Sequence, residues 1–203
     1  MKLRSRLVWA LTPPMIRAVA RVLWRLDVRL EHQFPEPPFV LAANHHSFLD
    51  PFLIGAVYSR PIRFIGLSDL YGHFRVVDFF LDAYQVIPVT RGLVPLRAMR
   101  ESLRHLQAGG VVGVFPEGTR HDVFDPADAL PGAAWLSLRA GVPLVCAAVR
   151  GSAAVLGVDN RLHRGTIGVV VGQNLVVRGS GRQAVDDLTG RWADWAASAL
   201  AGQ

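Results

Sequence analysis

The chain has 203 residues, of which 51% are hydrophobic and 19% are charged. This length fits one domain, and the apolar content excludes an intrinsically disordered chain. Mean hydropathy is +0.27, yet no run of about 18 uncharged apolar residues occurs, so we expect no membrane-spanning helix. The net charge of +6 comes almost entirely from arginine, since Lys2 is the only lysine. This composition fits an anionic partner and equally the arginine-rich coding of a GC-rich genome. A single cysteine, Cys146, excludes an internal disulfide and suits a reducing compartment.

Residues 14–31 have the periodicity of an amphipathic helix that begins near Pro14. Apolar residues recur at helical spacing, and arginines recur every four residues on the opposite face, at Arg17, Arg21, Arg25 and Arg29. Such a helix can lie at a membrane interface or pack on the core with its basic face in water, and the pattern leaves both open. We assign residues 1–33 to an N-terminal amphipathic membrane-association segment and residues 34–203 to the main domain.

Short apolar runs alternate with helical patterns along the main domain. Strands are predicted at 39–43, 62–65, 85–89, 111–115, 143–149 and 166–171. Helices are predicted at 52–58, 95–108, 133–140 and 185–199. This alternation predicts a single α/β domain with a mostly parallel sheet flanked by helices and preceded by the N-terminal helical segment.

The segment from Asn44 to Asp50 follows a predicted strand and brings an imidazole and a carboxylate close in sequence. His45 and Asp50 would point about 140° apart on one continuous helix, so they can meet only if His45 lies in the preceding loop. A carboxylate on the imidazole would fix its tautomer and make it a competent general base. Asp50 before Pro51, with Ser47 three residues earlier, equally matches a helix cap, and the segment alone leaves both readings open.

Two further predicted strands end in turns that contain arginine. Residues 115–120 read Phe-Pro-Glu-Gly-Thr-Arg and residues 88–92 read Pro-Val-Thr-Arg-Gly. Turns of this kind offer backbone N–H groups, a hydroxyl and a guanidinium to an anion. Two arginines at the strand ends of one sheet can converge on a phosphate, although either alone is as well explained by a surface ion pair.

Together and in this order, the segments resemble the glycerolipid acyltransferase family, which includes the lysophosphatidate (1-acylglycerol-phosphate) acyltransferases. The sequence Asn44-His45-x-Ser47-x-x-Asp50 is similar to the first block of the family, its His-x4-Asp motif. Residues 86–91 look like the second block, residues 115–120 match the third without a mismatch, and residues 142–145 resemble the fourth. The resemblance covers just over half of the chain.

The resemblance implies transfer of a fatty acyl group from an acyl-CoA or acyl-carrier-protein thioester to a hydroxyl of a lysophospholipid such as lysophosphatidate, in phospholipid biosynthesis or remodelling. It implies that His45 is the general base and that Asp50 orients it. The residues implied for binding the acceptor phosphate are Arg91, Glu117, Gly118, Thr119 and Arg120. Neither a metal nor a cofactor is implied beyond the thioester co-substrate. We expect peripheral or monotopic association with the cytoplasmic face of a membrane, an anionic surface as partner, and no nucleic acid.

Two departures from the family pattern matter here, besides His121, which follows the third block where a serine is often found. Gln85 stands where the second block usually begins with glycine, and Leu67 stands where a lysine that helps to bind phosphate often lies. The second departure leaves open another lyso-lipid or an acceptor without phosphate. Two other functions also remain: a thioester hydrolase in which His45 activates water, and a basic binding protein, for which no recognisable nucleic-acid motif is present.

Overall fold

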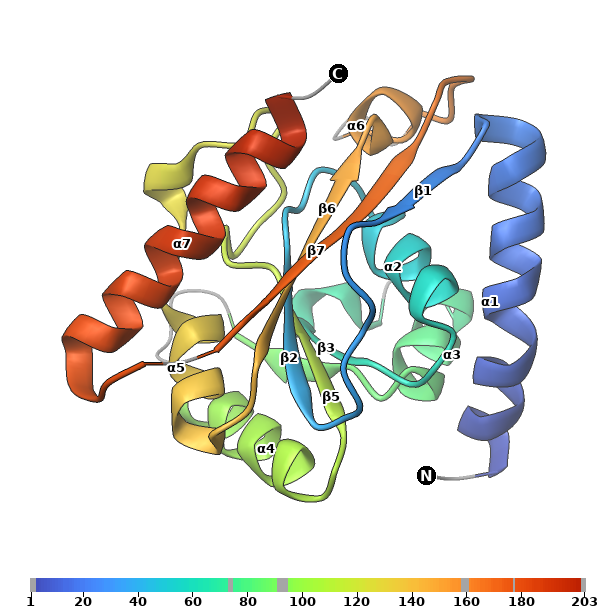
Figure 1. Ribbon diagram of the computed structural model, residues 1–203. Helices are drawn as coiled ribbons and strands as arrows, with labels where there is room; N and C mark the ends of the chain where they lie inside the picture. Colours follow the sequence, from blue (N-terminus) through green and yellow to red (C-terminus); the bar gives the residue numbers. More distant parts are fainter. Residues whose placement is uncertain (1–2, 73–74, 91–94, 158–160, 177, 202–203) are drawn as a thin grey trace.

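The computed structural model describes residues 3–72, 75–90, 95–157, 161–176 and 178–201. Within these residues, one sheet has seven strands in the order β1-β7-β6-β2-β5-β3-β4 (Figure 1). Strands β2 to β6 are parallel to one another, whereas β7 is antiparallel to β6 and pairs in parallel with β1 at the edge. The strands are β1 (Asp27–Leu30), β2 (Phe39–Ala43), β3 (Arg63–Leu67), β4 (Ile87–Val89), β5 (Val111–Val114), β6 (Leu144–Arg150) and β7 (Gly168–Leu175). The predicted mostly parallel sheet is confirmed.

Helices cover both faces of the sheet and make three layers. One face carries α1 (Leu3–Trp24), α2 (Asp50–Tyr58) and α3 (Arg75–Ala83). The other carries α4 (Leu96–Gln107), α5 (Gly132–Ala140) and α7 (Gly181–Ala201). Short turns of helix complete the described chain, namely η1 (Ser68–Leu70), η2 (Pro126–Asp128) and α6 (Ser152–Val155). The nine-residue helix α3 is absent from the prediction, because its short pattern lacks a clear cap.

The central strand β2 divides two hydrophobic cores. Phe39 and Leu41 point into the core beneath α1 and α2, whereas Val40 and Ala42 point into the core beneath α5 and α7. All four side chains are fully buried. A continuous apolar run is what a strand covered on both faces requires, and it holds the carboxyl end of β2 rigidly in the middle of the sheet.

The N-terminal helix differs from the prediction at both ends. It begins at Leu3 and continues through Pro13 and Pro14, because buried side chains on either side of the prolines hold it against α2 and α3 and override the local cost of proline. It ends at Trp24, and Arg25 takes a left-handed φ of 45°. Residues 27–30, expected in the helical segment, form edge strand β1 on β7, consistent with the period-two alternation of Asp27-Val28-Arg29-Leu30.

The inner face of α1 belongs to the core of the protein. Trp9 and Trp24 are buried, and the Trp9 ring lies against Gly55 of α2, where a Cβ atom would come within 3.3 Å of it. Arg17, expected on a free basic face, turns inward instead. Its guanidinium donates to the carbonyl oxygen of Ala56 and to the hydroxyl of Ser59, so it caps the carboxyl end of α2. The prediction of four arginines along one free helix face is therefore wrong, since Arg25 and Arg29 also lie beyond the end of α1.

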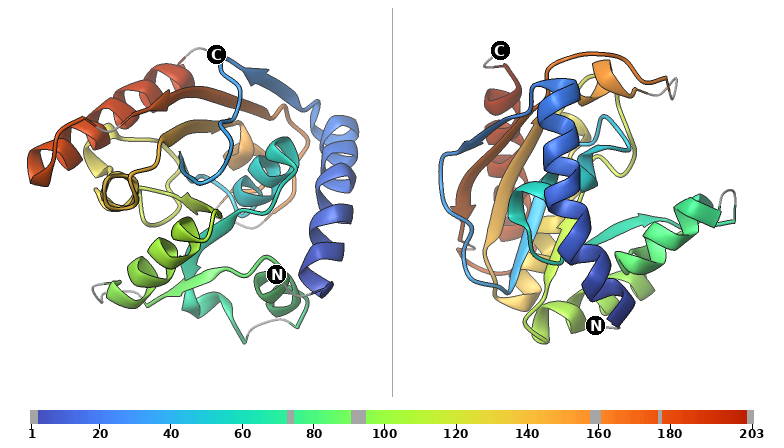
Figure 2. Two further views of the ribbon diagram at one scale, coloured as in Figure 1. Left: turned by 60° about the horizontal axis from the view of Figure 1, so that its bottom comes forward. Right: turned by 90° about the vertical axis from the view of Figure 1, so that its right-hand side faces the viewer.

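The outer face of α1 is apolar. Six large side chains on it are between 42% and 81% exposed, namely Leu7, Leu11, Met15, Val19, Val22 and Leu23. Figure 2 shows α1 on the outside of the molecule, with no other element over it in the right-hand view. Among the described residues, no helix has the length and apolarity that crossing a membrane requires.

Candidate active site

The first and third sequence blocks meet at the carboxyl end of the parallel strands, whereas the fourth block, residues 142–145, lies at the amino end of β6. The loop after β2 carries Asn44 to Asp50, and β2 lies between β5, which leads into residues 115–120, and β6. The carboxyl edge of a parallel sheet is the usual position of a site in α/β folds. The second block follows β4, two strands away from β5. Its arginine, Arg91, lies outside the described residues.

His45 and Asp50 form a hydrogen-bonded pair. The His45 Nδ1 atom lies 3.0 Å from Asp50 Oδ2, and the Asp50 side chain is completely buried, whereas that of His45 is 18% exposed. Because an ionised carboxylate only accepts hydrogen bonds, Nδ1 carries the proton and Nε2 keeps its lone pair. This is the tautomer that a general base needs at Nε2. The predicted loop position of His45 before the helix is confirmed.

Asp50 holds the loop as well as the imidazole. Its Oδ2 atom accepts hydrogen bonds from the backbone N–H groups of His46 and Ser47, both at 2.7 Å. These groups precede α2, whose cap residue is Leu49. The reading of Asp50 itself as the N-cap is therefore wrong. The predicted capping box between Ser47 and Asp50 is present, because the Ser47 N–H donates to Asp50 and the Ser47 hydroxyl oxygen accepts from the Leu49 N–H at 3.1 Å.

Asn44 ties this loop to the neighbouring strand. Its side-chain amide donates to the carbonyl oxygen of Val149 at 2.9 Å and accepts from the Val149 N–H at 2.7 Å. The amide thus continues the pairing of β2 with β6 beyond the end of β2. The sequence places Asn44 in the first block but predicts no role for it, since no local pattern identifies a partner in a distant strand.

An aromatic column lies beneath the catalytic imidazole. The rings of His45 and Phe115 are stacked with centroids 4.0 Å apart, and Phe115 stacks in turn on Phe64, with centroids 5.4 Å apart. A flat apolar surface restricts rotation of the imidazole. Phe115, the first residue of the third block, therefore holds the His45 ring in place by stacking.

Glu117 faces the catalytic loop. Its carboxyl group is buried and its Oε2 accepts a hydrogen bond from the backbone N–H of His45. Burial raises the pKa of Glu117 to about 8, and the Asp50 carboxylate acts in the same direction, against the opposing hydrogen bond from His45. Glu117 is therefore mostly uncharged at neutral pH. The structure gives it a backbone neighbour where the family resemblance implies a substrate phosphate.

Arg120 extends from the same turn toward the surface of the site. Its guanidinium lies over the Phe48 ring, 3.6 Å from the centroid. Burial lowers the pKa of Arg120, while the carboxylates of Asp50 and Asp122 oppose this effect. Its Nη1 atom is buried and has no hydrogen-bond partner among the residues that the structure describes. A planar cation with an unused donor suits a phosphate or carboxylate oxygen.

The turn that carries Glu117 and Arg120 depends on a glycine. Gly118 has a φ of 71°, and its N–H donates to the Phe115 carbonyl oxygen at 3.0 Å. This left-handed conformation strains other residue types. Gly118 is exposed and Thr119 is partly exposed, so both lie at the accessible side of the turn beside Arg120.

The comparisons with known proteins identify the family. The family model described as Acyltransferase matches residues 25–150, which is more than half of the chain and includes every residue of the site described above. The chain belongs to the acyltransferase family.

Relatives of this acyltransferase include 1-acyl-sn-glycerol-3-phosphate acyltransferases from several organisms. The enzyme of Pseudomonas aeruginosa is 27% identical over 92% of this chain and 72% of its own length. The enzyme of Bacillus subtilis is 25% identical over 68% of this chain and 66% of its own length. The chain spans only 42% and 50% of two further relatives, from Chlamydomonas reinhardtii and Mycoplasma genitalium.

A solved structure has a similar fold. The crystal structure of the 1-acyl-sn-glycerophosphate (LPA) acyltransferase PlsC from Thermotoga maritima matches with a TM-score of 0.69 over 94% of this chain and 80% of that one, at 21% identity. The likeness extends to the arrangement of a mostly parallel sheet with an N-terminal helix.

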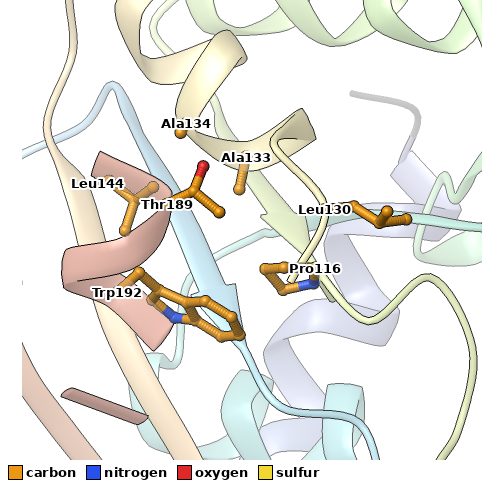
Figure 3. A pocket seen from close by; sticks show the side chains of 7 residues that line it. All are labelled: Pro116, Leu130, Ala133, Ala134, Leu144, Thr189 and Trp192. Atoms are coloured by element: carbon orange, nitrogen blue, oxygen red, sulfur yellow. The ribbon is translucent and has the colours of Figure 1, made fainter. Parts of the chain in front are cut away.

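The turn of the third block rests on a well-packed base. A cavity of about 10 Å³ lies beneath Pro116, and Figure 3 shows its lining side chains from α5, β6 and α7, with the Trp192 ring at one side. A space of this size with an apolar lining stays dry. The Trp192 Nε1 atom also donates to the Ala42 carbonyl oxygen at 3.0 Å. The acyltransferase thus supports the turn from below with the second hydrophobic core.

The only cysteine of the acyltransferase is poorly placed for covalent chemistry. Cys146 is fully buried in β6, and burial raises its thiol pKa to about 12. A thiol in this state is not a nucleophile at neutral pH. The site therefore offers a histidine–aspartate pair and an arginine, which suits proton transfer from a hydroxyl and binding of an anion.

Proposed function

We propose that this acyltransferase transfers a fatty acyl group from an acyl thioester to the free hydroxyl of lysophosphatidate. The observation that carries the proposal is the His45–Asp50 pair, which leaves Nε2 as a base. The adjoining turn after β5 is bound to His45 through the His121 N–H, and it carries Arg120, whose Nη1 has no hydrogen-bond partner among the described residues. The names of the Pseudomonas and Bacillus relatives support the acceptor.

In the proposed reaction, His45 Nε2 removes the proton from the acceptor hydroxyl as its oxygen attacks the thioester carbonyl carbon. Asp50 stabilises the resulting imidazolium. The tetrahedral intermediate then expels the thiolate, which takes the proton back from His45. No acyl-enzyme forms, and the reaction uses neither a metal nor an organic cofactor, because a thioester carbonyl is already activated for attack. General-base catalysis of this kind contributes about 10²–10⁴-fold in rate.

The residues of the third block have separate roles in this proposal. Arg120 binds the acceptor phosphate, and the exposed backbone at Gly118 and Thr119 adjoins it. The family resemblance assigns Arg91 of the second block to the same phosphate. Glu117 acts through His45, because an uncharged buried carboxyl group that accepts from the His45 N–H positions the base and leaves the phosphate site without an opposing charge.

The test is a purified-protein assay with acyl-coenzyme A and a panel of lyso-lipids, with products identified by mass spectrometry. The proposal expects phosphatidate from lysophosphatidate, and loss of nearly all turnover in His45→Ala. His32→Ala is the control, because His32 is exposed and precedes β2. Retention of wild-type turnover by correctly folded His45→Ala contradicts the mechanism, and release of free fatty acid without acylated product identifies a thioester hydrolase instead.

A second acceptor is favoured by Leu67, which stands at the carboxyl end of β3, beside β5. An apolar side chain at this edge removes one cation from the predicted phosphate site. We therefore include lyso-lipids with larger or uncharged head groups in the panel. Improved use of lysophosphatidate by Leu67→Lys would indicate that the natural acceptor is one of these.

We further propose that α1 docks the acyltransferase peripherally on an anionic membrane surface, on the cytoplasmic face. The apolar outer face of α1 is continuous, and the basic residues Arg4, Arg6 and Arg21 near its ends are exposed. An exposed apolar stripe flanked by basic residues suits the boundary between head groups and acyl chains.

Co-sedimentation with phosphatidylglycerol vesicles tests the docking. Leu11→Asp should release the protein from vesicles, because a charge would enter the apolar boundary. Leu96→Asp is the matched control, since Leu96 is 60% exposed against 67% for Leu11 but lies on α4 across the sheet. Equal binding by both variants contradicts the proposal. Deletion of α1 would be a poor test, because Trp9 and Trp24 belong to the core.

A further inference from the structure

A second and larger cavity adjoins the catalytic loop from the side opposite α1. Its volume is about 320 Å³, which lies at the lower end of the range for small-molecule sites. The last turns of α7 line it with Ala197 and Leu200, and the chain after the third block lines it with Asp122 and Phe124. Figure 1 shows α7 and α1 at opposite edges of the molecule.

The cavity lies against the loop that carries His45. His46, the next residue after the base, lines it, and the His46 N–H donates to Asp50 at 2.7 Å. The backbone N–H of His121 donates to the carbonyl oxygen of His45 at 3.0 Å, so the segment that carries Asp122 is also bound to His45. A ligand in this cavity therefore lies against the loop that holds the reacting atoms.

The walls of the cavity combine apolar and polar groups. Phe124, Ala197 and Leu200 supply apolar surface, while His46 and Asp122 supply hydrogen-bonding groups. His46 is 9% exposed, and its Nε2 is a buried atom with no hydrogen-bond partner in the described part of the chain. Burial lowers the pKa of His46, so its ring is neutral at neutral pH. Buried polar atoms normally have a partner, and an unpartnered one beside a cavity points to a ligand that supplies it.

We propose that this cavity binds the pantetheine arm of the acyl thioester donor. The inference rests on the proposed acyl-transfer function and specifies where its donor binds. A pantetheine arm alternates amide groups with short apolar segments and a dimethyl group, which matches a slot with mixed walls. An alkyl chain would leave His46 Nε2 without a partner. The arm is common to coenzyme A and to acyl-carrier protein, so the cavity serves either donor.

The arrangement separates the two substrates. The acceptor lipid reaches His45 from the membrane side, where α1 presents its apolar face, and the thioester reaches it from the side of α7. This division accounts for an opening at the carboxyl end of α7 that the phosphate-binding role of the third block does not use.

A binding experiment tests the inference without turnover. The probe is S-ethyl pantetheine, a thioether that cannot donate an acyl group, titrated calorimetrically into the full-length protein. Ala197→Phe fills the cavity and should weaken binding by about tenfold or more. Ser198→Phe is the matched control, because Ser198 is the next residue on α7 but is exposed and lies outside the cavity lining; it should bind as the wild type does.

A second, smaller substitution at the same residue gives an independent measurement in case Ala197→Phe does not fold. Ala197→Cys is a small change, and the native Cys146 is buried and unreactive, so iodoacetamide labelling reports on residue 197 alone. S-ethyl pantetheine should slow this labelling, and it should leave labelling of Ser198→Cys unchanged.

The outcomes separate this inference from the proposed function. Equal probe affinity in the wild type and Ala197→Phe, with no protection of Cys at 197, overturns the pantetheine site even if acyl transfer occurs. A change in acyl-chain preference of Ala197→Phe at unchanged probe affinity also overturns it, because the cavity then holds the chain. If the wild type binds the probe and Ala197→Phe weakens this binding, but no acyl transfer is detected, the pantetheine site is supported and the proposed function is contradicted.

Discussion

Replacement of Glu117 by glutamine tests whether a buried, uncharged carboxyl group positions the catalytic base. The folded-state pKa of Glu117 is about 8, against an ordinary value of 4.5. Because the folded protein binds the proton more tightly than the unfolded chain, the associated stability is fully present below pH 4.5 and is lost as the pH rises through 8. Glutamine keeps the carbonyl oxygen that accepts from the His45 N–H, and it cannot ionise.

The magnitude follows from the proton bound by the folded state. Between about pH 6 and pH 8, Glu117 in the folded protein is mostly protonated while the unfolded chain is ionised, so the wild type loses about 2 kcal/mol of unfolding free energy that Glu117→Gln retains. Urea denaturation of both proteins at each pH measures this difference. Other titrating groups, His46 among them, are common to both and cancel. A difference that stays constant to within about 0.5 kcal/mol across this range refutes the assignment.

The activity of the same variants distinguishes positioning from phosphate binding. Glu117→Gln should keep most of its kcat at neutral pH, whereas Glu117→Ala should lose about tenfold or more, because the buried His45 N–H is left unpaired at a cost of about 1–3 kcal/mol. Above pH 8 the wild type should lose affinity for a phosphate-bearing acceptor as Glu117 ionises beside it. The affinity of the glutamine variant for the same acceptor should not fall above pH 8. An increase in acceptor KM in Glu117→Gln at neutral pH, with kcat unchanged, would show that Glu117 contributes to binding of the acceptor phosphate.

Three further substitutions give expected outcomes. Asp50→Asn should lower kcat by about 10²-fold or more, because an amide cannot stabilise the imidazolium. Circular dichroism checks that the variant folds, and an unchanged kcat would contradict the role of Asp50 in supporting His45. Arg120→Ala should lower acceptor kcat/KM by about tenfold or more for a loss of about 1.5–3 kcal/mol, with a smaller effect on neutral acceptors, and equal losses would remove the phosphate role. Arg17→Ala should lower the unfolding free energy by about 1–3 kcal/mol in urea, since the Ala56 carbonyl oxygen loses its charged donor and keeps only the Ser59 hydroxyl, whereas the exposed Arg21→Ala should change it little.

The sequence was most informative where chemistry is local. The five-residue spacing of His45 and Asp50 required the histidine to lie in a loop before the helix, and the structure has this arrangement. The strand ends that carry the first and third blocks meet because β2 and β5 are neighbours in a parallel sheet. Short, continuous apolar runs were sufficient to predict these strands, because a strand that is buried on both faces must be apolar throughout.

The sequence was least informative where the partner of a residue is distant. Arg17 has the spacing of a surface stripe, and only the packing of α1 on α2 turns it toward Ala56. The carboxyl group of Glu117 looks like a charged ligand in a turn, yet burial beneath the catalytic loop makes it uncharged. Edge strand β1 was read as helix because Leu26 and Leu30 also fit a helical period, and the choice is made by pairing with β7. These outcomes depend on tertiary contacts that no short window contains.

The amide bridge from Asn44 to Val149 also has a consequence for folding order. These residues are 105 positions apart, so the loop that carries the base is fixed only after β6 has docked beside β2. Contacts between distant segments form late, since the loop between them must first be closed at an entropic cost. A chain emerging from the ribosome therefore has its histidine and aspartate long before it has an active centre, and catalytic competence begins with the sixth strand.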